Sequence, residues 1–329
     1  MIYKLKTIEK TMVCIILTLV MGCGQKSNVK TIKLAHGLDV SHPVHVAMEF
    51  MADRVEEKSK GTLKIDIYPS QQLGTERECL ELLQIGSLGM TKVSTGVLEN
   101  FAPGMKVFGL PFLFRDREHY YNVLDSDLGQ ELLGEGKKYW LKGIAYYDAG
   151  SRSFYTINKP IHTPEDLKGL KIRVQESASS IDMVKALGGS PTPVSWGELY
   201  TALQQGIVDG AENNPPSFYL SHHYEVCKYY TIDEHTYLPD VLVMSTVVWD
   251  QLSEEERKWL QDGVEESVKY QRTLWQKAEK DAIEAVKADG VEVIYPDKQL
   301  FSSKVEEMYD SYGSEARMNS LIQKIKNTK

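Results

Sequence analysis

The chain has 329 residues, of which 42% are hydrophobic and 26% are charged, a composition typical of a soluble globular protein. This length favours about two domains. The formal net charge of −8 argues against nucleic acid as the main partner, because phosphate binding needs a basic surface.

The N-terminus has the pattern of an export signal. Three lysines precede an apolar stretch over 12–21 that is too short to span a bilayer. The stretch ends in Gly22-Cys23, which resembles the lipobox of bacterial lipoproteins, where the cysteine carries a diacylglycerol after cleavage. We therefore predict a signal peptide over 1–22, lipid attachment at Cys23, a polar tether over 23–30 and a periplasmic, membrane-tethered protein. An ordinary signal peptide or a short anchor is the alternative.

The chain after the tether alternates strand and helix patterns, which favours an α/β fold with parallel strands. In the first half, the predicted strands are 31–37 and 62–69, and the predicted helices are 42–60 and 75–85. In the second half, strands are predicted over 143–150, 171–174 and 206–210, a short helix after Thr163-Pro164, and a capping box over 195–198.

One helix is predicted to be unusually long. Ser253 and Glu256 form a capping box, and helical patterning continues to about Lys287, with Gly290 as the stop. Roughly 35 residues make a helix of about 50 Å, longer than one compact domain is wide. The apolar positions do not hold the heptad of a coiled coil, so we expect a helix that spans two domains.

Catalytic motifs are absent from the sequence. It contains no G-x-S-x-G, no glycine-rich phosphate loop and no H-E-x-x-H, so we expect no enzyme activity, no cofactor and no metal. His42 and His45 lie near His36, but no Cys or acidic ligand accompanies them at suitable spacing, and a capping or hydrogen-bonding role is expected. Cys79 and Cys227 are expected to be buried free thiols, with a disulfide as the alternative. A sugar-acid lyase or isomerase remains an alternative function.

Three polar residues lie where strands end. Arg152 follows the strand over 143–150, Arg173 lies near the end of the strand over 171–174, and Asn213 follows that over 206–210. If these strands are parallel neighbours, the three side chains converge at the carboxyl edge of the sheet, where α/β domains bind ligands. Two guanidinium groups and an amide suit a carboxylate. The alternative is structural ion pairing of Arg152 with Asp148 and of Arg173 with Glu176.

Several segments resemble the solute-binding subunits of tripartite ATP-independent periplasmic (TRAP) transporters, the DctP-like family. They are "ALGGSPTPVSWGELYTALQQGIVDGAENNPPSFY" (186–219), "LPFLFRD" (110–116), "GLKIRVQES" (169–177) and "GTLKIDIYPSQQLGTERE" (61–78). The resemblance implies a two-domain periplasmic binding protein fold that closes about a hinge. It assigns 31–150 with about 239–278 to one domain and 151–238 with about 279–329 to the other. It also implies small and large TRAP membrane subunits as partners.

The resemblance further implies an organic acid as ligand, with Arg173 forming the carboxylate salt bridge and Arg152 and Asn213 beside it. The segments "GAENNPPSFY" and "GTERE" resemble those of hexuronate-binding members, so D-glucuronate or D-galacturonate is expected. A C4-dicarboxylate or another organic acid, or a sensory binding protein that presents its ligand to a receptor, remains an alternative.

A sugar acid needs hydroxyl partners as well as the arginines. We expect Glu76 to accept hydroxyl protons from the ligand, and Lys92 to donate to hydroxyls or to meet a second carboxylate. His36, His235 and Tyr237 are further candidates, because they lie at a strand end and where the second domain crosses back to the first. A ligand that bridges the arginines to Glu76 and Lys92 would favour the closed form.

Overall fold

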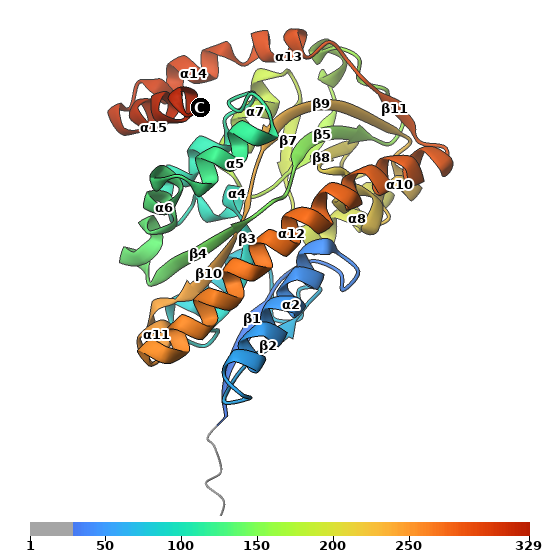
Figure 1. Ribbon diagram of the computed structural model, residues 1–329. Helices are drawn as coiled ribbons and strands as arrows, with labels where there is room; N and C mark the ends of the chain where they lie inside the picture. The colour runs from blue at the N-terminus through green and yellow to red at the C-terminus, as the bar shows by residue number, and fades with distance from the viewer. Residues whose placement is uncertain (1–28) are drawn as a thin grey trace, which may run out of the picture.

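The computed structural model describes residues 29–329, which fold around two β-sheets (Figure 1). The predicted signal peptide, Cys23 and most of the tether lie outside the described residues. Within residues 29–329, no helix combines the length and the apolar character that a membrane span requires.

The first sheet has the strand order β2-β1-β3-β10-β4. Its strands are β1 (Lys30–Ala35), β2 (Leu63–Tyr68), β3 (Met90–Ser94), β4 (Leu141–Tyr147) and β10 (Asp240–Ser245). Strands β1, β2 and β3 are parallel, as the alternation of strand and helix predicts, whereas β10 is antiparallel to β3 and to β4. Since β10 returns from the second sheet, it enters the first sheet in the opposite direction.

The second sheet has the order β11-β9-β5-β8-β6-β7. Its strands are β5 (Ser151–Thr156), β6 (Lys171–Val174), β7 (Ser190–Pro193), β8 (Gly210–Asn213), β9 (Tyr229–Tyr237) and β11 (Glu292–Ile294). Strands β6, β7 and β8 are parallel, but β5 is antiparallel to both β8 and β9. The strand predicted over 206–210 begins only at Gly210, as β8. The chain turns just before it, at Gly206, whose φ is +66°.

Two short segments of chain connect the sheets. Residues 148–150 link β4 to β5, and residues 238–239 link β9 to β10. The chain thus passes from one sheet to the other close to the predicted domain boundaries at 150 and 238. The domain ranges themselves stay a prediction.

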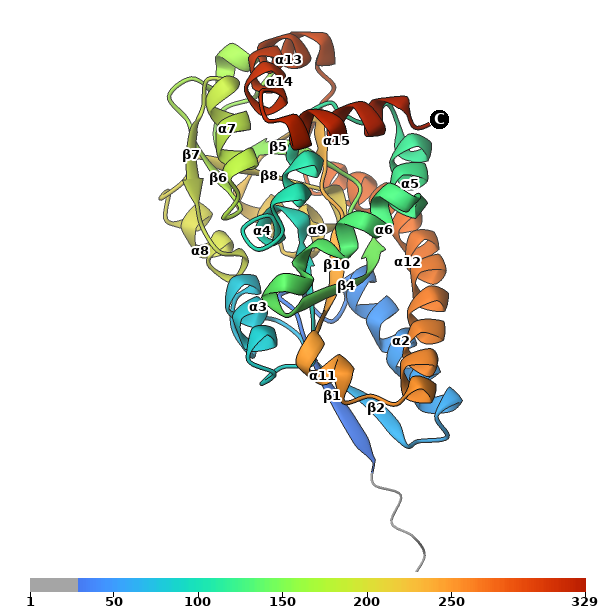
Figure 2. The same cartoon turned by 90° about the vertical axis from the view of Figure 1, so that its left-hand side faces the viewer.

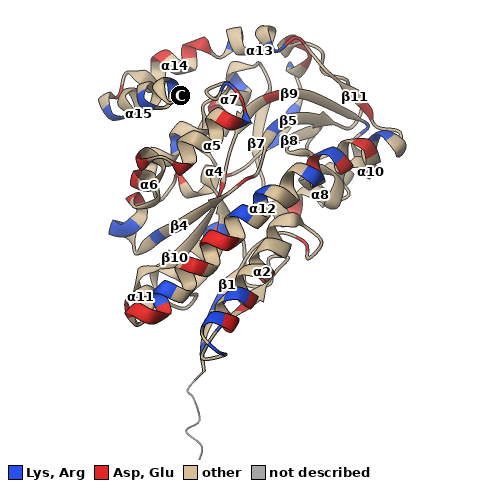
Figure 3. Cartoon of the chain, in the orientation of Figure 1, with Lys and Arg blue, Asp and Glu red and all other residues tan. Residues whose placement is uncertain are grey.

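Helix α12 (Glu254–Ala288) is the long helix that the sequence predicts, with 35 residues and the expected capping box between Ser253 and Glu256. It packs against α2 (Pro43–Lys58) beside the first sheet and against α9 (Pro215–Leu220) beside the second (Figures 1 and 2). The approach to α2 is close, because a Cβ on Gly263 would lie 2.8 Å from Val55 Cγ2. Acidic and basic residues alternate along the outer face of α12 (Figure 3).

The remaining helices surround the two sheets. They are α3 (Glu76–Gln84), α4 (Thr95–Leu98), η1 (Pro103–Gly109), α5 (Arg117–Asp125), α6 (Asp127–Leu133), η2 (Glu135–Tyr139), η3 (Pro164–Leu167), α7 (Ala178–Ala186), η4 (Trp196–Glu198), α8 (Leu199–Gln204), α10 (His223–Val226), α11 (Thr246–Asp250), α13 (Lys298–Lys304), α14 (Glu306–Gly313) and α15 (Ala316–Asn327). The η elements are 3-10 helices. One of them replaces the predicted capping box at 195–198, where the Ser195 hydroxyl donates to the Glu198 carboxylate.

The C-terminal helix α15 crosses back to the first half of the chain. His119 on α5 bonds the carbonyl oxygen of Ile325 at 2.9 Å, and Arg115 Nη1 donates to the carbonyl of Lys326 at 3.1 Å. The C-terminal segment therefore contacts residues that the sequence assigns to the other domain. Cys79 and Cys227 are buried free thiols, as expected.

Candidate ligand-binding site

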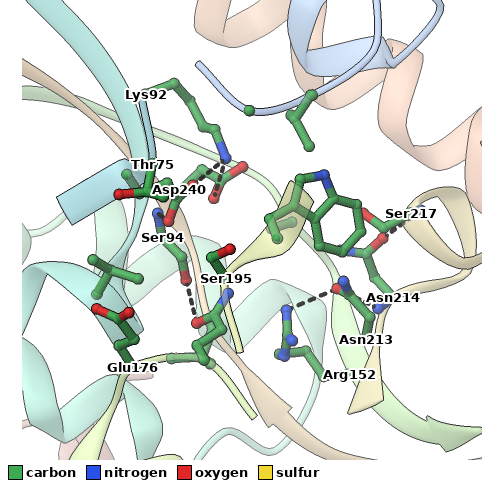
Figure 4. A pocket seen from close by; sticks show the side chains of 18 of the residues that line it. Thr75, Lys92, Ser94, Arg152, Glu176, Ser195, Asn213, Asn214, Ser217 and Asp240 are labelled. Carbon is green, nitrogen blue, oxygen red and sulfur yellow. Dashed lines mark hydrogen bonds and ion pairs between the residues drawn. The ribbon is translucent and has the colours of Figure 1, made fainter. Parts of the chain in front are cut away.

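A cavity lies between the two sheets and is lined by residues from both (Figure 4). Its space is about 740 Å³, counting the part that opens to solvent. The first half of the chain contributes Glu76, Lys92 and Ser94, and the second half contributes Arg152, Arg173 and Asn213.

Arg173 lines this cavity and forms no ion pair with a carboxylate of residues 29–329. Its side chain comes from β6, and the residue is only 2% exposed. Nε donates to the carbonyl oxygen of Val194 at 2.8 Å, while Nη1 is buried without a hydrogen-bond partner in residues 29–329. Burial lowers the pKa of Arg173, because it penalises the charged form. The alternative, a structural pair with Glu176, is not formed, so the guanidinium is available to an anion.

Arg152 on β5 has a different environment, because Glu212 on β8 neutralises it. Nε donates to Glu212 Oε2 at 2.5 Å and Nη2 to Glu212 Oε1 at 2.9 Å. Nη2 also donates to the Glu212 carbonyl, and Nη1 donates to Asn213 Oδ1 at 2.8 Å. Four of the five guanidinium N–H groups are thus engaged within the protein. The alternative pair with Asp148 does not exist, since Asp148 instead accepts from Tyr121.

Asn213 is oriented by this ion pair. Its Oδ1 accepts from Arg152 and also from the backbone N–H of Asn214 at 2.9 Å. Because both partners donate, the oxygen must face them, and the amide nitrogen is the donor that this cavity-lining side chain keeps. Asn213 therefore presents a donor group, as a carboxylate or hydroxyl ligand requires.

His235 contacts the Glu212 carboxylate of this ion pair. Its Nδ1 bonds Asp233 Oδ2 at 2.9 Å, and its Nε2 lies 3.5 Å from Glu212 Oε2. Burial lowers the pKa of His235, but Asp233 and Glu212 outweigh burial and raise it to about 9. Burial likewise raises the pKa of Glu212, while Arg152 and His235 bring it down to about 2.

The two arginines and Asn213 converge, although the three strands are not all parallel neighbours as the sequence predicts. Strands β6 and β8 are parallel, so Arg173 and Asn213 lie at the same edge, as predicted. Arg152, however, lies at the start of β5, directly after Ser151, rather than following a parallel strand. Since β5 runs antiparallel to β8, its start lies beside the end of β8, and Ser153 pairs with Asn213.

The opposite wall carries three charged side chains in contact. Lys92 Nζ, on β3, lies 2.9 Å from Glu76 Oε1 and 3.3 Å from Asp240 Oδ1. Glu76 Oε2 also accepts from the backbone N–H of Ser94 at 3.2 Å. Burial lowers the pKa of Lys92, but Asp240 and Glu76 outweigh it and hold the pKa above its ordinary value. The ammonium group is therefore charged and already paired.

Contacts between the two halves of the chain close the cavity. A Cβ on Gly37 would lie 3.3 Å from both Gln71 Cγ and Trp196 Cδ1, so Trp196 lies directly against the first half. His42 Nε2 lies 3.3 Å from Ser217 Oγ, and Ser94 Oγ donates to Gln175 Oε1 at 3.0 Å. His42 also caps α2 through its side chain, the capping role that was expected.

Three of the predicted site residues do not line this cavity, and their role in binding stays a prediction. His36 is buried against His45, with its Nε2 2.9 Å from His45 Nδ1. His235 lies behind Glu212, and the Tyr237 ring packs against Phe114 and Tyr120.

Sequence reasoning missed Glu212, Asp240 and Trp196, which hold or enclose the site. A signal was present for the two carboxylates, because each lies in a short apolar strand where an acidic side chain needs a partner. Nothing in the sequence indicated that Trp196, in the second half of the chain, lies against Gly37 in the first half. Within residues 29–329, no cluster of three or more His, Cys, Asp or Glu side chains could hold a metal ion.

Two α/β units, two crossing segments and a cavity lined by charged residues from both units define an extracytoplasmic solute-binding protein. Residues 34–315 match the family described as "Bacterial extracellular solute-binding protein, family 7". The chain belongs to this family, the DctP family of TRAP transporter solute-binding proteins.

Known relatives cover nearly the whole chain. The uncharacterized protein YiiZ of Salmonella typhimurium is 41% identical over 291 residues, which are 88% of this chain and 89% of that protein. A TRAP solute-binding protein of Xanthobacter autotrophicus Py2, solved with β-D-galacturonate, has a TM-score of 0.88 and 38% identity, covering 91% of this chain and 100% of the other. One of Pseudomonas putida F1, solved with D-glucuronate, has a TM-score of 0.87 and 37% identity, covering 90% and 97%.

Proposed function

We propose that this protein captures a hexuronate, D-galacturonate or D-glucuronate, and delivers it to the small and large membrane subunits of a TRAP transporter. In this proposal the protein binds its ligand and does not transform it. The similar proteins solved with these two sugar acids support the ligand class.

The single observation that carries the proposal is the state of Arg173. A buried guanidinium cannot lose its proton to escape burial, so it needs an anionic partner. Arg173 is 2% exposed, lines the cavity and has no carboxylate partner in residues 29–329. A carboxylate on the ligand would supply that partner.

The other lining groups fit the rest of a sugar acid. The Asn213 amide nitrogen and the one N–H of Arg152 that remains unused would donate to the ligand, and the carboxylate oxygens of Glu76 would accept from sugar hydroxyls. Since these residues come from both sheets, one ligand would contact both walls. Such contacts favour the closed form, because only that form makes them together.

Isothermal titration calorimetry on the purified protein tests the ligand class. We expect D-galacturonate or D-glucuronate to bind in the micromolar range or tighter, as is usual for a built small-molecule site, and C4-dicarboxylates to give no response. Tight binding of a C4-dicarboxylate with no response to any hexuronate would overturn the assignment.

Arg173→Ala and a matched control test the carboxylate clamp. Lys171 lies on the same strand, is exposed and does not line the cavity, so Lys171→Ala removes a similar charge without touching the site. We expect Arg173→Ala to weaken hexuronate binding at least about 100-fold, the loss of a buried charge-assisted contact, and Lys171→Ala to leave it unchanged. Equal affinities of both variants would show that Arg173 is structural.

The proposal includes a lipid anchor at Cys23, which rests on the sequence of the N-terminus alone. Growth of the source cells with a labelled fatty acid should label the wild-type protein in the membrane fraction and should leave Cys23→Ser unlabelled. Equal labelling of both, or none, would remove the anchor from the proposal and leave its ligand unaffected.

A further inference from the structure

The wall of the cavity that comes from the first sheet and α3 carries an excess of negative charge. Glu76, Lys92 and Asp240 all line it, and their side chains are 14%, 4% and 11% exposed. With two carboxylates and one ammonium, the ionised group has a net charge of −1. Arg173 therefore favours a negatively charged group on a ligand, whereas the cluster of Glu76, Lys92 and Asp240 disfavours one.

Lys92 is not free to bind a second anion. Its ammonium contacts Glu76 Oε1 at 2.9 Å and Asp240 Oδ1 at 3.3 Å, and it is nearly buried between them. In residues 29–329, Lys92 is the one side chain that bonds the Asp240 carboxylate. An incoming carboxylate would meet at least one carboxylate oxygen that Lys92 does not cover, whereas a hydroxyl would donate a hydrogen bond to it.

We infer that the cluster of Glu76, Lys92 and Asp240 selects sugar acids that carry one carboxylate and rejects the diacids of the same chain length. This inference rests on the proposed function, since it assumes that Arg173 binds one carboxylate. Like charges brought together in a desolvated site cost several kcal/mol, which corresponds to about 100-fold or more in affinity. The charge at the far end of the ligand thus decides whether it is accepted.

Two open-chain acids isolate this effect. D-galactonate and galactarate share their carbon chain and their first carboxylate, and differ only at the far end, which is CH₂OH in one and carboxylate in the other. Calorimetry at about pH 7 should show galactarate binding to the wild-type protein about 100-fold more weakly than galactonate. Equal affinity for the two acids would overturn the inference.

Two charge-removing variants and one control identify the cause. Glu76→Gln and Asp240→Asn keep the side-chain shapes and bring the cluster to neutral, and each should reduce the discrimination at least about tenfold. Glu81 lies on the same helix as Glu76 but is exposed outside the cavity, so Glu81→Gln should leave the discrimination as in the wild type. Discrimination that is unchanged in both cavity variants would overturn the inference, and circular dichroism identifies a variant that does not fold.

The outcomes also separate this inference from the proposed function. If the wild type binds neither open-chain acid measurably, a gain of galactarate binding in either cavity variant supports the inference, and no gain in both overturns it. D-galacturonate and D-glucuronate are titrated in parallel. Failure of both hexuronates would defeat the proposed function, whereas hexuronate binding together with equal galactonate and galactarate affinities would defeat only the selection by charge.

Discussion

Arg152 and Glu212 form an ion pair that is buried on both sides, with Nε and Nη2 of the arginine donating to the two oxygens of the carboxylate. The pair joins adjacent strands of the second sheet, and it positions Asn213 at the cavity through a third hydrogen bond. Its role is therefore to orient the binding residues, while Arg173 keeps the uncompensated charge that a ligand needs.

Glu212→Gln should destabilise the protein strongly, because it leaves the charge of Arg152 buried without its partner. We expect the free energy of unfolding to fall by about 3–5 kcal/mol in urea denaturation. Glu225→Gln is the matched control, since Glu225 bonds Tyr200 at the surface of the same half of the chain, and its loss should cost about 0–1 kcal/mol. Similar losses in the two variants would contradict this account.

His235 should make the stability fall with rising pH. Its pKa of about 9 in the folded protein lies above the ordinary value of 6.5, because the folded state favours the protonated ring. This stabilisation is complete below about pH 6.5 and is lost as the pH rises to about 9, with a maximum of about 3 kcal/mol. The carboxylates that face the ring are those of Asp233 and Glu212, and the pKa of Glu212 lies at about 2, far below this range.

The reference for this pH dependence is His235→Gln, which cannot gain the proton. The difference in unfolding free energy between wild type and variant, measured in urea, should be largest near pH 6 and should shrink toward pH 9. A difference that grows with pH would show that His235 is neutral in the folded protein.

Trp196→Ala should weaken ligand binding without unfolding the protein. The indole packs against both hydrophobic cores and lies against Gly37 across the cavity mouth, so it stabilises the closed arrangement. Loss of this packing should lower hexuronate affinity about tenfold, equivalent to about 1.4 kcal/mol. Small-angle scattering with ligand should show a more extended particle than the wild type. Trp140→Ala is the control, because Trp140 is exposed and remote from the cavity.

Gln271→Ala should loosen the crossing between the sheets. The Gln271 side chain accepts from the backbone N–H of Asp148 at 2.9 Å and donates to its carbonyl at 2.7 Å, which fixes the crossing segment to the middle of α12. The variant leaves two buried backbone groups unpaired, at about 1–3 kcal/mol each.

The measurement for this variant is hydrogen exchange at the Asp148 amide, which should become much faster in Gln271→Ala. Gln261→Ala, at an exposed position of the same helix, should leave that exchange unchanged. Equal protection of the Asp148 amide in both variants would show that Gln271 does not hold the crossing.

The regular elements were predictable because their signals are local. Capping boxes begin α3 and α12 at Thr75 and Ser253, and hydrophobic alternation defines β1 and β2. The errors occurred where tertiary pairing decides. Nothing local indicates that β5 and β10 run antiparallel to their neighbours, because that direction depends on how the chain returns between the sheets.

The sequence by itself determined the fold class, the long helix and the place of Arg173 near a strand end, because spacing, capping and apolar periodicity are written in neighbouring residues. The family was indicated by the resemblance of several segments to those of known members. Only the tertiary structure decided which arginine keeps an available charge. Glu212 neutralises Arg152, whereas no carboxylate of residues 29–329 pairs with Arg173. Lys92 is held by Glu76 and Asp240 from distant parts of the chain. Charge compensation is a property of positions in space, and for this reason the site residues could be named from the sequence but their roles could not.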